Sequence, residues 1–423
     1  MRNRVVQILC IVTLVASTSV GLFGQQTLNH LDYSLHYRQG KSYFDAKNYI
    51  AAHEEFSSYL TSLRNGAPDQ ANEKTLAEYY LAMCAIYSMR PEAEVVADRF
   101  AANHPEIPQS VKLIKDIGSF FYETGDSQRP IKYLSNASFT NLEWKYKLAV
   151  SYYELKKFLE ALTVFNEIKV ENEEEYAFPA SYYAGVINFN EKRYAEAVVD
   201  FQKAEGGSKF RKEIPNWIGL CYFNQSKLTE LLNYAEPIIA KKNTGYRLDE
   251  LALLVADVQF QLNQFEKSIK SYEIYGKLTG LQYSPLSQYR LGYALFKTKK
   301  YNESSSQLKP LLAKKDTLSQ YAAYSIALGQ LSAGNLIASL EAFDVARTLT
   351  FNKTIQEEAY FNHAKVQLDL GRGAETIDEI KKFNELYPTS KFSEEATELV
   401  ADAFINSNKI GRASCRERVS SPV

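Results

Sequence analysis

The sequence predicts an all-α protein: a right-handed superhelical solenoid of about ten helix-turn-helix repeats and one truncated repeat. One short phrase returns along the chain, in which a small residue precedes an aromatic residue by three or four positions. A polar turn follows, and then Tyr or Phe, two further residues and an alanine. The phrase recurs at the period typical of stacked helix pairs, which is about 34 residues.

Each copy of the phrase encodes two amphipathic helices. In one clear copy, Trp144, Leu148 and Tyr152 recur at helical spacing and line one face. After a polar turn, Phe158 and Ala161 begin a second apolar face. Small residues in both helices allow a close approach, and larger side chains there would overpack the contact at a cost of about 1–3 kcal/mol each.

The small residue of the first helix gives the register of the repeats. Most copies lie 31 to 37 residues apart, but the first step is longer because it includes a loop at residues 66–69. A single pair cannot bury its own faces, so neighbouring pairs must stack. The register residues are Gly40, Cys84, Gly118, Ala149, Gly185, Gly219, Ala256, Gly292, Ala327 and Ala364, with a half-copy at Ala401. The second-helix alanines that we expect to pack against them are Ala52, Ala161 and Ala197.

Prolines and capping residues mark the ends of several predicted helices. Ser284 precedes a proline, which gives a capping hydroxyl followed by a proline in the first turn. Pro179 and Pro215 likewise suit helix starts. Two other prolines cannot continue a helix and should close second helices, namely Pro105 and Pro388.

The repeated phrase closely resembles the tetratricopeptide repeat. Matching stretches are residues 78–85 (EYYLAMCA), 291–298 (LGYALFKT) and 385–390 (ELYPTS). Over nearly the whole chain, the sequence also resembles the long secreted tetratricopeptide proteins of Bacteroidota. The resemblance implies a protein that binds other macromolecules, and it brings no catalytic residues and no established ligand.

The first residues predict a secretory signal peptide at residues 1–24. Arg2 and Arg4 precede an apolar run over residues 5–20, and we expect cleavage before Gln25. A single amino-terminal transmembrane helix is the alternative. Cys10 lies inside the run without a small residue before it, so lipidation is not expected. We therefore expect an exported protein of the periplasm or cell envelope, with its repeats at residues 25–409.

The end of the chain departs from the pattern. After Lys409 the repeat requires a turn and a second helix, but residues 410–423 lack helical apolar spacing. We interpret them as an adaptor-derived, non-native and disordered tail; a basic tail that docks a partner is the alternative. We expect the natural protein to continue with further repeats beyond Lys409.

The charge of the repeats excludes an electrostatic nucleic-acid binder. The chain has a formal net charge of −1. Arg2 and Arg4 contribute +2, and the tail from Gly411 contributes another +2, which leaves −5 for the repeats. Binding to nucleic acid needs a basic stripe instead. The same charge excludes strong attraction to an anionic membrane surface, and we expect no integral membrane span after signal removal.

No motif in the sequence indicates chemistry. The five histidines lack metal-ligand spacing, and there is neither a phosphate-binding loop nor a nucleophile elbow. Cys84 and Cys221 stand four repeats apart at tight-packing positions, which favours buried thiols over a disulfide framework. We interpret the acidic stretch 171–175 as a solvated loop or a helix start; a calcium site is the alternative. We predict no catalytic residue, no cofactor, no metal and no enzyme activity.

The candidate partner-binding residues are rings on the first helices, which line the concave side in this type of repeat. Positions three before and four after the small residue are seven apart and share one face of a helix. Aromatic faces suit a peptide or a sugar, but the repeat favours aromatics there in any case, so packing is the alternative. The ladder comprises Tyr37, Phe44, Tyr122, Tyr146, Tyr153, Tyr182, Phe189, Phe223, Phe260, Tyr289 and Phe296.

The function expected from these observations is a non-enzymatic protein–protein interaction scaffold that binds an unidentified protein through its concave face. Two alternatives stay open: a glycan-binding helical component of an outer-membrane nutrient-uptake system, and an enzyme domain lying beyond residue 409. The position after the small residue never holds Asn. That absence argues against the subclass that clamps the carboxylate of chaperone tails.

Overall fold

The computed structural model describes residues 34–64, 71–135, 141–241 and 247–419. Over these ranges the chain is α-helical apart from turns and one 3-10 helix, without a strand. The predicted all-α fold class is therefore confirmed. The signal peptide predicted at residues 1–24 lies outside the described residues. The hand of the superhelix stays a prediction.

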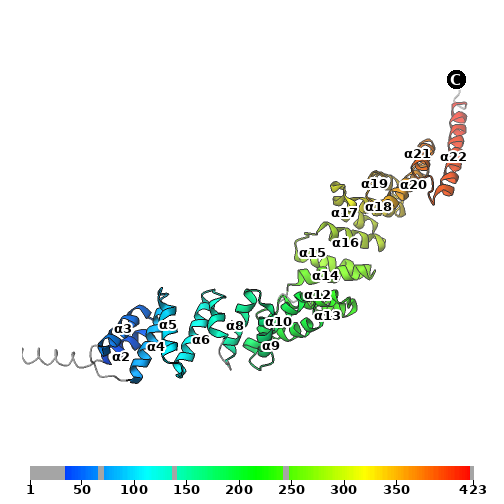
Figure 1. Ribbon diagram of the computed structural model, residues 1–423. Coiled ribbons are helices and arrows are strands. Elements are labelled where there is room, and N and C mark those ends of the chain that lie inside the picture. The colour runs from blue at the N-terminus through cyan, green and yellow to red at the C-terminus, as the bar shows by residue number, and fades with distance from the viewer. Residues whose placement is uncertain (1–33, 65–70, 136–140, 242–246, 420–423) are drawn as a thin grey trace, which may run out of the picture. The chain divides into compact units, whose positions relative to one another are not determined.

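The helices form ten antiparallel pairs, each joined by a turn, and one further helix follows them (Figure 1). Each pair corresponds to one copy of the phrase. The pairs of the first half are α2 (Ser34–Asp45) and α3 (Tyr49–Arg64), α4 (Ala71–Tyr87) and α5 (Ala93–Asn103), α6 (Pro108–Glu123) and α7 (Arg129–Leu134), α8 (Leu142–Glu154) and α9 (Phe158–Ile168), and α10 (Glu174–Asn190) and α11 (Tyr194–Ala204). The pairs of the second half are α12 (Ile214–Asn224) and α13 (Leu228–Ala240), α14 (Leu248–Gln261) and α15 (Phe265–Leu278), α16 (Pro285–Lys297) and α17 (Tyr301–Leu308), α18 (Thr317–Ser332) and α19 (Leu336–Thr348), and α20 (Lys353–Asp369) and α21 (Gly373–Leu386). The 3-10 helix η1 (Lys309–Lys314) extends α17, and α22 (Ser393–Val419) begins an eleventh copy.

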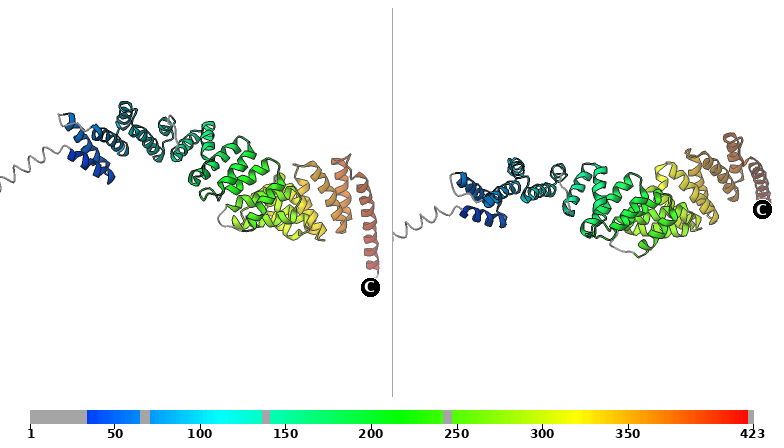
Figure 2. Two further views of the ribbon diagram at one scale, coloured as in Figure 1. Left: turned by 90° about the horizontal axis from the view of Figure 1, so that it is seen from below. Right: turned by 60° about the horizontal axis from the view of Figure 1, so that its bottom comes forward.

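The chain forms two compact units, one ending at Ile187 and the other beginning at Asn188, so the boundary falls inside α10. Within each unit, successive pairs pack side by side (Figures 1 and 2). In both units, a first helix packs against the second helix of its own pair and against the second helix of the preceding pair. This is the stacking that buries the apolar faces a lone pair would leave exposed.

One backbone conformation turns the chain between the two helices of a pair. Seven positions after the small residue, the backbone enters the left-handed region in nine of the ten pairs. Three of these positions are glycines, Gly125, Gly334 and Gly371, but six carry side chains at φ between 56° and 63°. In the remaining pair the turn is shorter, and the left-handed residue is Met89. The geometry of the repeat therefore imposes this conformation even where the residue is unfavourable.

The small residue faces a large side chain sixteen positions later, on the second helix of the same pair. A Cβ added at Gly40 would lie 3.0 Å from the ring of Phe56. At Gly292 it would lie 2.5 Å from Leu308. All residues at this later position are buried: Phe56, Phe100, Leu134, Phe165, Phe201, Ala235, Tyr272, Leu308, Phe343 and Ile380. The small glycines Gly40 and Gly292 thus lie at close contacts between the helices of their pairs.

Gly219 packs differently from its counterparts. Its own second helix offers only Ala235 at the facing position, and that side chain is too short to fill the contact. A Cβ at Gly219 would instead meet Leu254 at 3.0 Å and Leu251 at 3.3 Å, both on α14 of the next pair. The glycine still permits a close helix approach, but the partner helix is the following one.

Most predicted helix ends are confirmed. The Ser284 hydroxyl accepts a hydrogen bond from the backbone N–H of Ser287 at 3.1 Å, and a proline opens the helix after it. Pro215 lies in the first turn of α12. The second helices α5 and α21 end one residue before His104 and Tyr387, each of which precedes a proline.

The expected helix start at Pro179 is wrong. The helix α10 begins at Glu174, and Pro179 lies inside it. Acidic residues at its first turn face the positive end of the helix and favour the earlier start. The acidic stretch at 171–175 is therefore partly a helix start, as one of the two predicted readings had it.

The last helix also extends further than expected. The helix α22 runs through Val419, past the boundary predicted at Lys409, so helical backbone occupies part of the tail that was expected to be disordered. Residues 410–419 include arginine, alanine and glutamate, which have high helix propensity. Extending an existing helix also costs little free energy compared with starting a new one. The foreign origin of residues 410–423 stays a prediction.

Both cysteines of the described repeats are buried and free. Burial raises the pKa of Cys84 to about 12, and burial likewise raises the pKa of Cys221 to about 12. Each thiol therefore stays protonated and unreactive at neutral pH. This outcome confirms the interpretation of the two cysteines as small packed residues.

Candidate protein-binding surface

In five pairs, the ladder ring four positions after the small residue packs against the start of its own second helix. Four positions after the small residue, the ring contacts the aromatic residue that opens the second helix. The centroid distances lie between 5.4 and 6.1 Å. The pairs of rings are Phe44–Tyr49, Tyr153–Phe158, Phe189–Tyr194, Phe260–Phe265 and Phe296–Tyr301. These rings thus hold the turn of their own repeat.

Several of the same rings also contact the first helix of the next pair. Phe44 lies 4.8 Å from Tyr80, and Tyr153 lies 4.9 Å from Tyr183. In the second unit, Phe189 lies 5.0 Å from Trp217. The receiving rings are Tyr80, Tyr183 and Trp217. They stand at first-helix positions that vary from pair to pair, so the repeated phrase does not identify them.

Ladder rings three positions before the small residue also pack against other rings of the protein. Tyr37 lies 6.0 Å from Phe56, and Tyr146 lies 6.4 Å from Phe165, which are the residues that face the small positions. Tyr289 contacts Tyr293 and Tyr321 instead. Burial raises the pKa of Tyr146 and of Tyr153, so these phenols stay neutral at physiological pH.

Most of the ladder therefore consists of half-buried, packed rings. Ten of its eleven residues, including Tyr122 and Tyr182, are intermediate in exposure. The exception is Phe223, whose side chain is 40% exposed. Its second helix opens with Leu228 instead of a ring, and within the described residues Phe223 forms no ring contact. Phe223 is thus the ladder residue most available to a partner.

Hydrogen bonds join neighbouring first helices beside the ladder. Asn216 on α12 donates to Glu250 on α14 at 2.6 Å, and Arg290 on α16 pairs with Asp257 on α14 at 2.8 Å. Further along, Tyr324 on α18 donates to Glu358 on α20 at 2.7 Å. These contacts fix the spacing of the first helices and therefore the spacing of the rings that they carry.

The part of the chain that the structure describes holds no candidate metal site beside these surfaces. No group of three or more His, Cys, Asp or Glu side chains there could hold a metal ion. Nor does any helix of those ranges combine the length and apolar character that a membrane crossing requires. His36, one of the histidines considered for a metal, bonds instead to Glu55 at 2.7 Å.

Residues 145–172, which comprise most of α8, all of α9 and the turns beside them, match the family model described as "Tetratricopeptide repeat". The segment is a tetratricopeptide repeat. Eight of the other nine pairs share its left-handed turn position, and all nine share its buried second-helix residue. The predicted resemblance to tetratricopeptide proteins is thereby confirmed.

Several solved tetratricopeptide structures are similar to the chain at low sequence identity. A tetratricopeptide repeat protein of Parabacteroides merdae is 12% identical, with 62% of this chain and 98% of that one covered and a TM-score of 0.35. The C-terminal part of a repeat-containing protein from Cytophaga hutchinsonii is 14% identical, with 63% and 91% covered and a TM-score of 0.37. A domain of yeast Sti1, solved in an HSP90 complex, is 15% identical, with 62% and 98% covered and a TM-score of 0.31. No curated protein sequence matches the chain.

Proposed function

We propose that this chain is an exported, non-enzymatic scaffold that binds a protein partner through the first-helix face of its repeats. The observation that carries the proposal is a set of rings at one register position, held in place by the turns of their own repeats. Rings already fixed by packing lose little conformational freedom on binding, so their contact energy is retained. Exposed edges of Tyr and Phe also suit apolar and peptide groups.

Within the second unit, Phe223 is the centre of this proposed surface. Phe189, Phe260 and Phe296 occupy the same register position on neighbouring first helices, and each is held by the ring that opens its second helix. A ring that is exposed and flanked by immobile neighbours resembles the anchor of an interface hot spot.

The proposed location is the periplasm or the cell envelope. Arg2 and Arg4 before the apolar run at residues 5–20 support export. Expression in a bacterial host followed by fractionation tests this part. We expect a mature protein whose first residue is Gln25 in the exported fraction, and an uncleaved cytoplasmic product would refute it.

Partner binding is tested by photo-crosslinking, with a photoreactive phenylalanine analogue at position 223. We expect one protein to be crosslinked in envelope extract, and the change Phe223→Ala should reduce its capture by the mature protein at least tenfold. Ile337→Ala is the matched control, because Ile337 is 62% exposed on a second helix of the same unit. Equal capture by both variants would place the binding surface elsewhere, and a crosslinked glycan would favour the nutrient-uptake alternative.

A further inference from the structure

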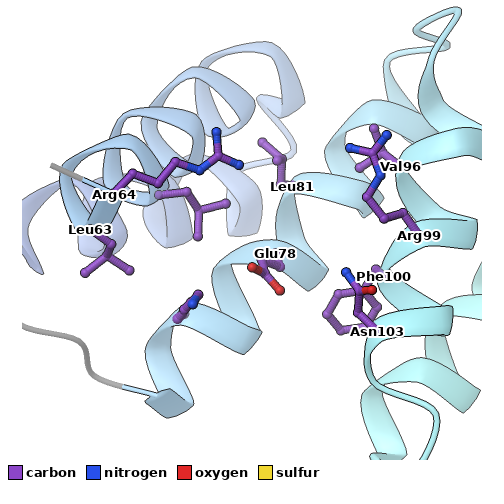
Figure 3. Close-up of a pocket in the computed structure, with 10 residues that line it drawn as sticks. Leu63, Arg64, Glu78, Leu81, Val96, Arg99, Phe100 and Asn103 are labelled. Atoms are coloured by element: carbon purple, nitrogen blue, oxygen red, sulfur yellow. The ribbon is translucent and has the colours of Figure 1, made fainter.

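A cavity of about 410 Å³ opens between α3, α4 and α5 of the first unit (Figure 3). Its size lies within the range of small-ligand pockets, which is about 300–1,000 Å³. The three helices bring together residues of two successive repeats. In the sequence, the feature that corresponds to this cavity is the long spacing between the first two repeats. The helices on either side of residues 65–70, α3 and α4, are 16 and 17 residues long. Both provide part of the cavity wall.

The cavity combines an apolar lining with cationic side chains. Its apolar side chains come from all three helices: Leu60, Leu63, Leu81, Val96 and Phe100. Three cations also line it: Arg64 from the end of α3, Lys74 from α4 and Arg99 from α5. All three are exposed. Within the described residues, none of them forms an ion pair or a hydrogen bond.

Several carboxylates of the surrounding helices are already engaged. Glu78, the one acidic residue lining the cavity, bonds to the Nε2 atom of His104 at 2.8 Å. On the same helix, Glu73 accepts a hydrogen bond from Tyr59 at 3.2 Å. On α5, Asp98 pairs with Lys132 at 3.2 Å. Within the described residues, none of the three cations has an acidic partner, although the repeats as a whole are acidic.

A second cavity shows that this charge is not a general property of the repeat. A cavity of about 430 Å³ lies between α17, α18 and α19 of the second unit, where two successive second helices again flank a first helix. Its charged lining residues are Lys309 and Glu341, one of each sign, and most of its other polar groups are Ser, Asn and Gln. The excess of cations is thus absent from this comparable cavity of the second unit.

We propose that this cavity binds an acidic peptide segment of a protein partner. One apolar side chain of the peptide would contact Leu63, Leu81 and Phe100, while flanking carboxylates would pair with the cations. Arginine suits this role because its planar group binds a carboxylate through two parallel hydrogen bonds. The site is independent of Phe223, which belongs to the other unit.

Fluorescence anisotropy with three labelled pentapeptides tests the proposal on the mature chain. The peptides are Glu-Asp-Leu-Asp-Glu, its uncharged counterpart Gln-Asn-Leu-Asn-Gln, and Glu-Asp-Ser-Asp-Glu, which lacks the apolar side chain. We expect the first to bind at least tenfold more tightly than either of the others. Its affinity should also fall as salt is added, because exposed charges are screened.

The double change Arg64→Gln and Arg99→Gln should weaken binding of the first peptide at least tenfold. Both side chains are exposed, so the fold should persist, and circular dichroism checks it. Lys309→Gln is the matched control, since it removes a cation from the cavity of the second unit; it should leave binding unchanged, as should Phe223→Ala. No binding of the acidic peptide, equal binding of the uncharged peptide, or undiminished binding by the double variant would each overturn the proposal. Loss of envelope-partner capture by Phe223→Ala alone would leave this site intact, so the two proposals fail separately.

Discussion

Twelve positions after the small residue, the clearest early repeats and the last four repeats carry different side chains. The early ones have alanine, at Ala52, Ala161 and Ala197, and all three are buried. The last four have a hydroxyl that donates to the carbonyl oxygen of the small residue, over 2.7 to 3.4 Å. The hydroxyl residues are Ser268, Ser304, Ser339 and Thr376.

In these seven pairs the contact takes a small side chain, whether that side chain is apolar or carries a hydroxyl. A buried hydroxyl is tolerated when it is hydrogen-bonded, and here the first helix offers a carbonyl oxygen at a fixed place. The other three pairs have larger residues at this position instead: Val96, Pro130 and Leu231.

The largest effect should come from filling the contact at the small residue itself. Gly40→Leu in an alanine-type pair and Gly292→Leu in a hydroxyl-type pair should each lower the free energy of unfolding by about 1–3 kcal/mol or more. Gly292→Leu should cost more, because an added Cβ already meets Leu308 at 2.5 Å, against 3.0 Å from Phe56 at Gly40. Thermal and urea unfolding measure both.

Glu174→Ala is the control for these two variants, since it removes an exposed charge and should change stability by about 0.5 kcal/mol or less. Thermal midpoints indistinguishable from the control would contradict the tight contact. If the two leucine variants differed in the opposite order, the alanine-type pair would be the less tolerant one.

A smaller effect is expected at the turn that both kinds of pair share. Gly334 has φ of +79°, and nothing lies within 4 Å of an added Cβ, so Gly334→Ala should cost about 1 kcal/mol from the backbone alone. Lys156 has φ of +59° at the equivalent position of an alanine-type pair, and Lys156→Gly should stabilise by a similar amount. Chemical denaturation measures both, and two changes of the same sign would refute a common turn.

The smallest effect should come from exchanging alanine and serine at the position twelve residues after the small residue. Ser304→Ala removes a hydrogen bond of 2.7 Å to Gly292 but leaves no bulky gap, so it should cost about 0.5–1 kcal/mol. Ala161→Ser should be close to neutral if the carbonyl oxygen of Ala149 can accept the new hydroxyl. A cost of several kcal/mol for Ala161→Ser, measured by urea unfolding, would show that the alanine-type pairs are too tightly packed for the hydroxyl.

Part of the candidate binding surface could be predicted and part could not. The ladder positions follow from helical periodicity, and most of the rings that the sequence named do share one register of the first helices. Their exposure could not be predicted in the same way. The ring of Phe223 is accessible because Leu228 opens its second helix, whereas Phe260 is covered by Phe265.

By itself, the sequence determined the helix pairs, their register, their turns and most of their ends. These features depend on residues within about one repeat of each other, and the same local pattern returns often enough to be recognised. Only the tertiary structure decided that α10 begins before Pro179, that Gly219 packs on the next pair, and that Arg64, Lys74 and Arg99 line one cavity. The reason is physical: burial and charge pairing depend on which side chain of a neighbouring helix arrives opposite, and the repeated phrase leaves those positions variable.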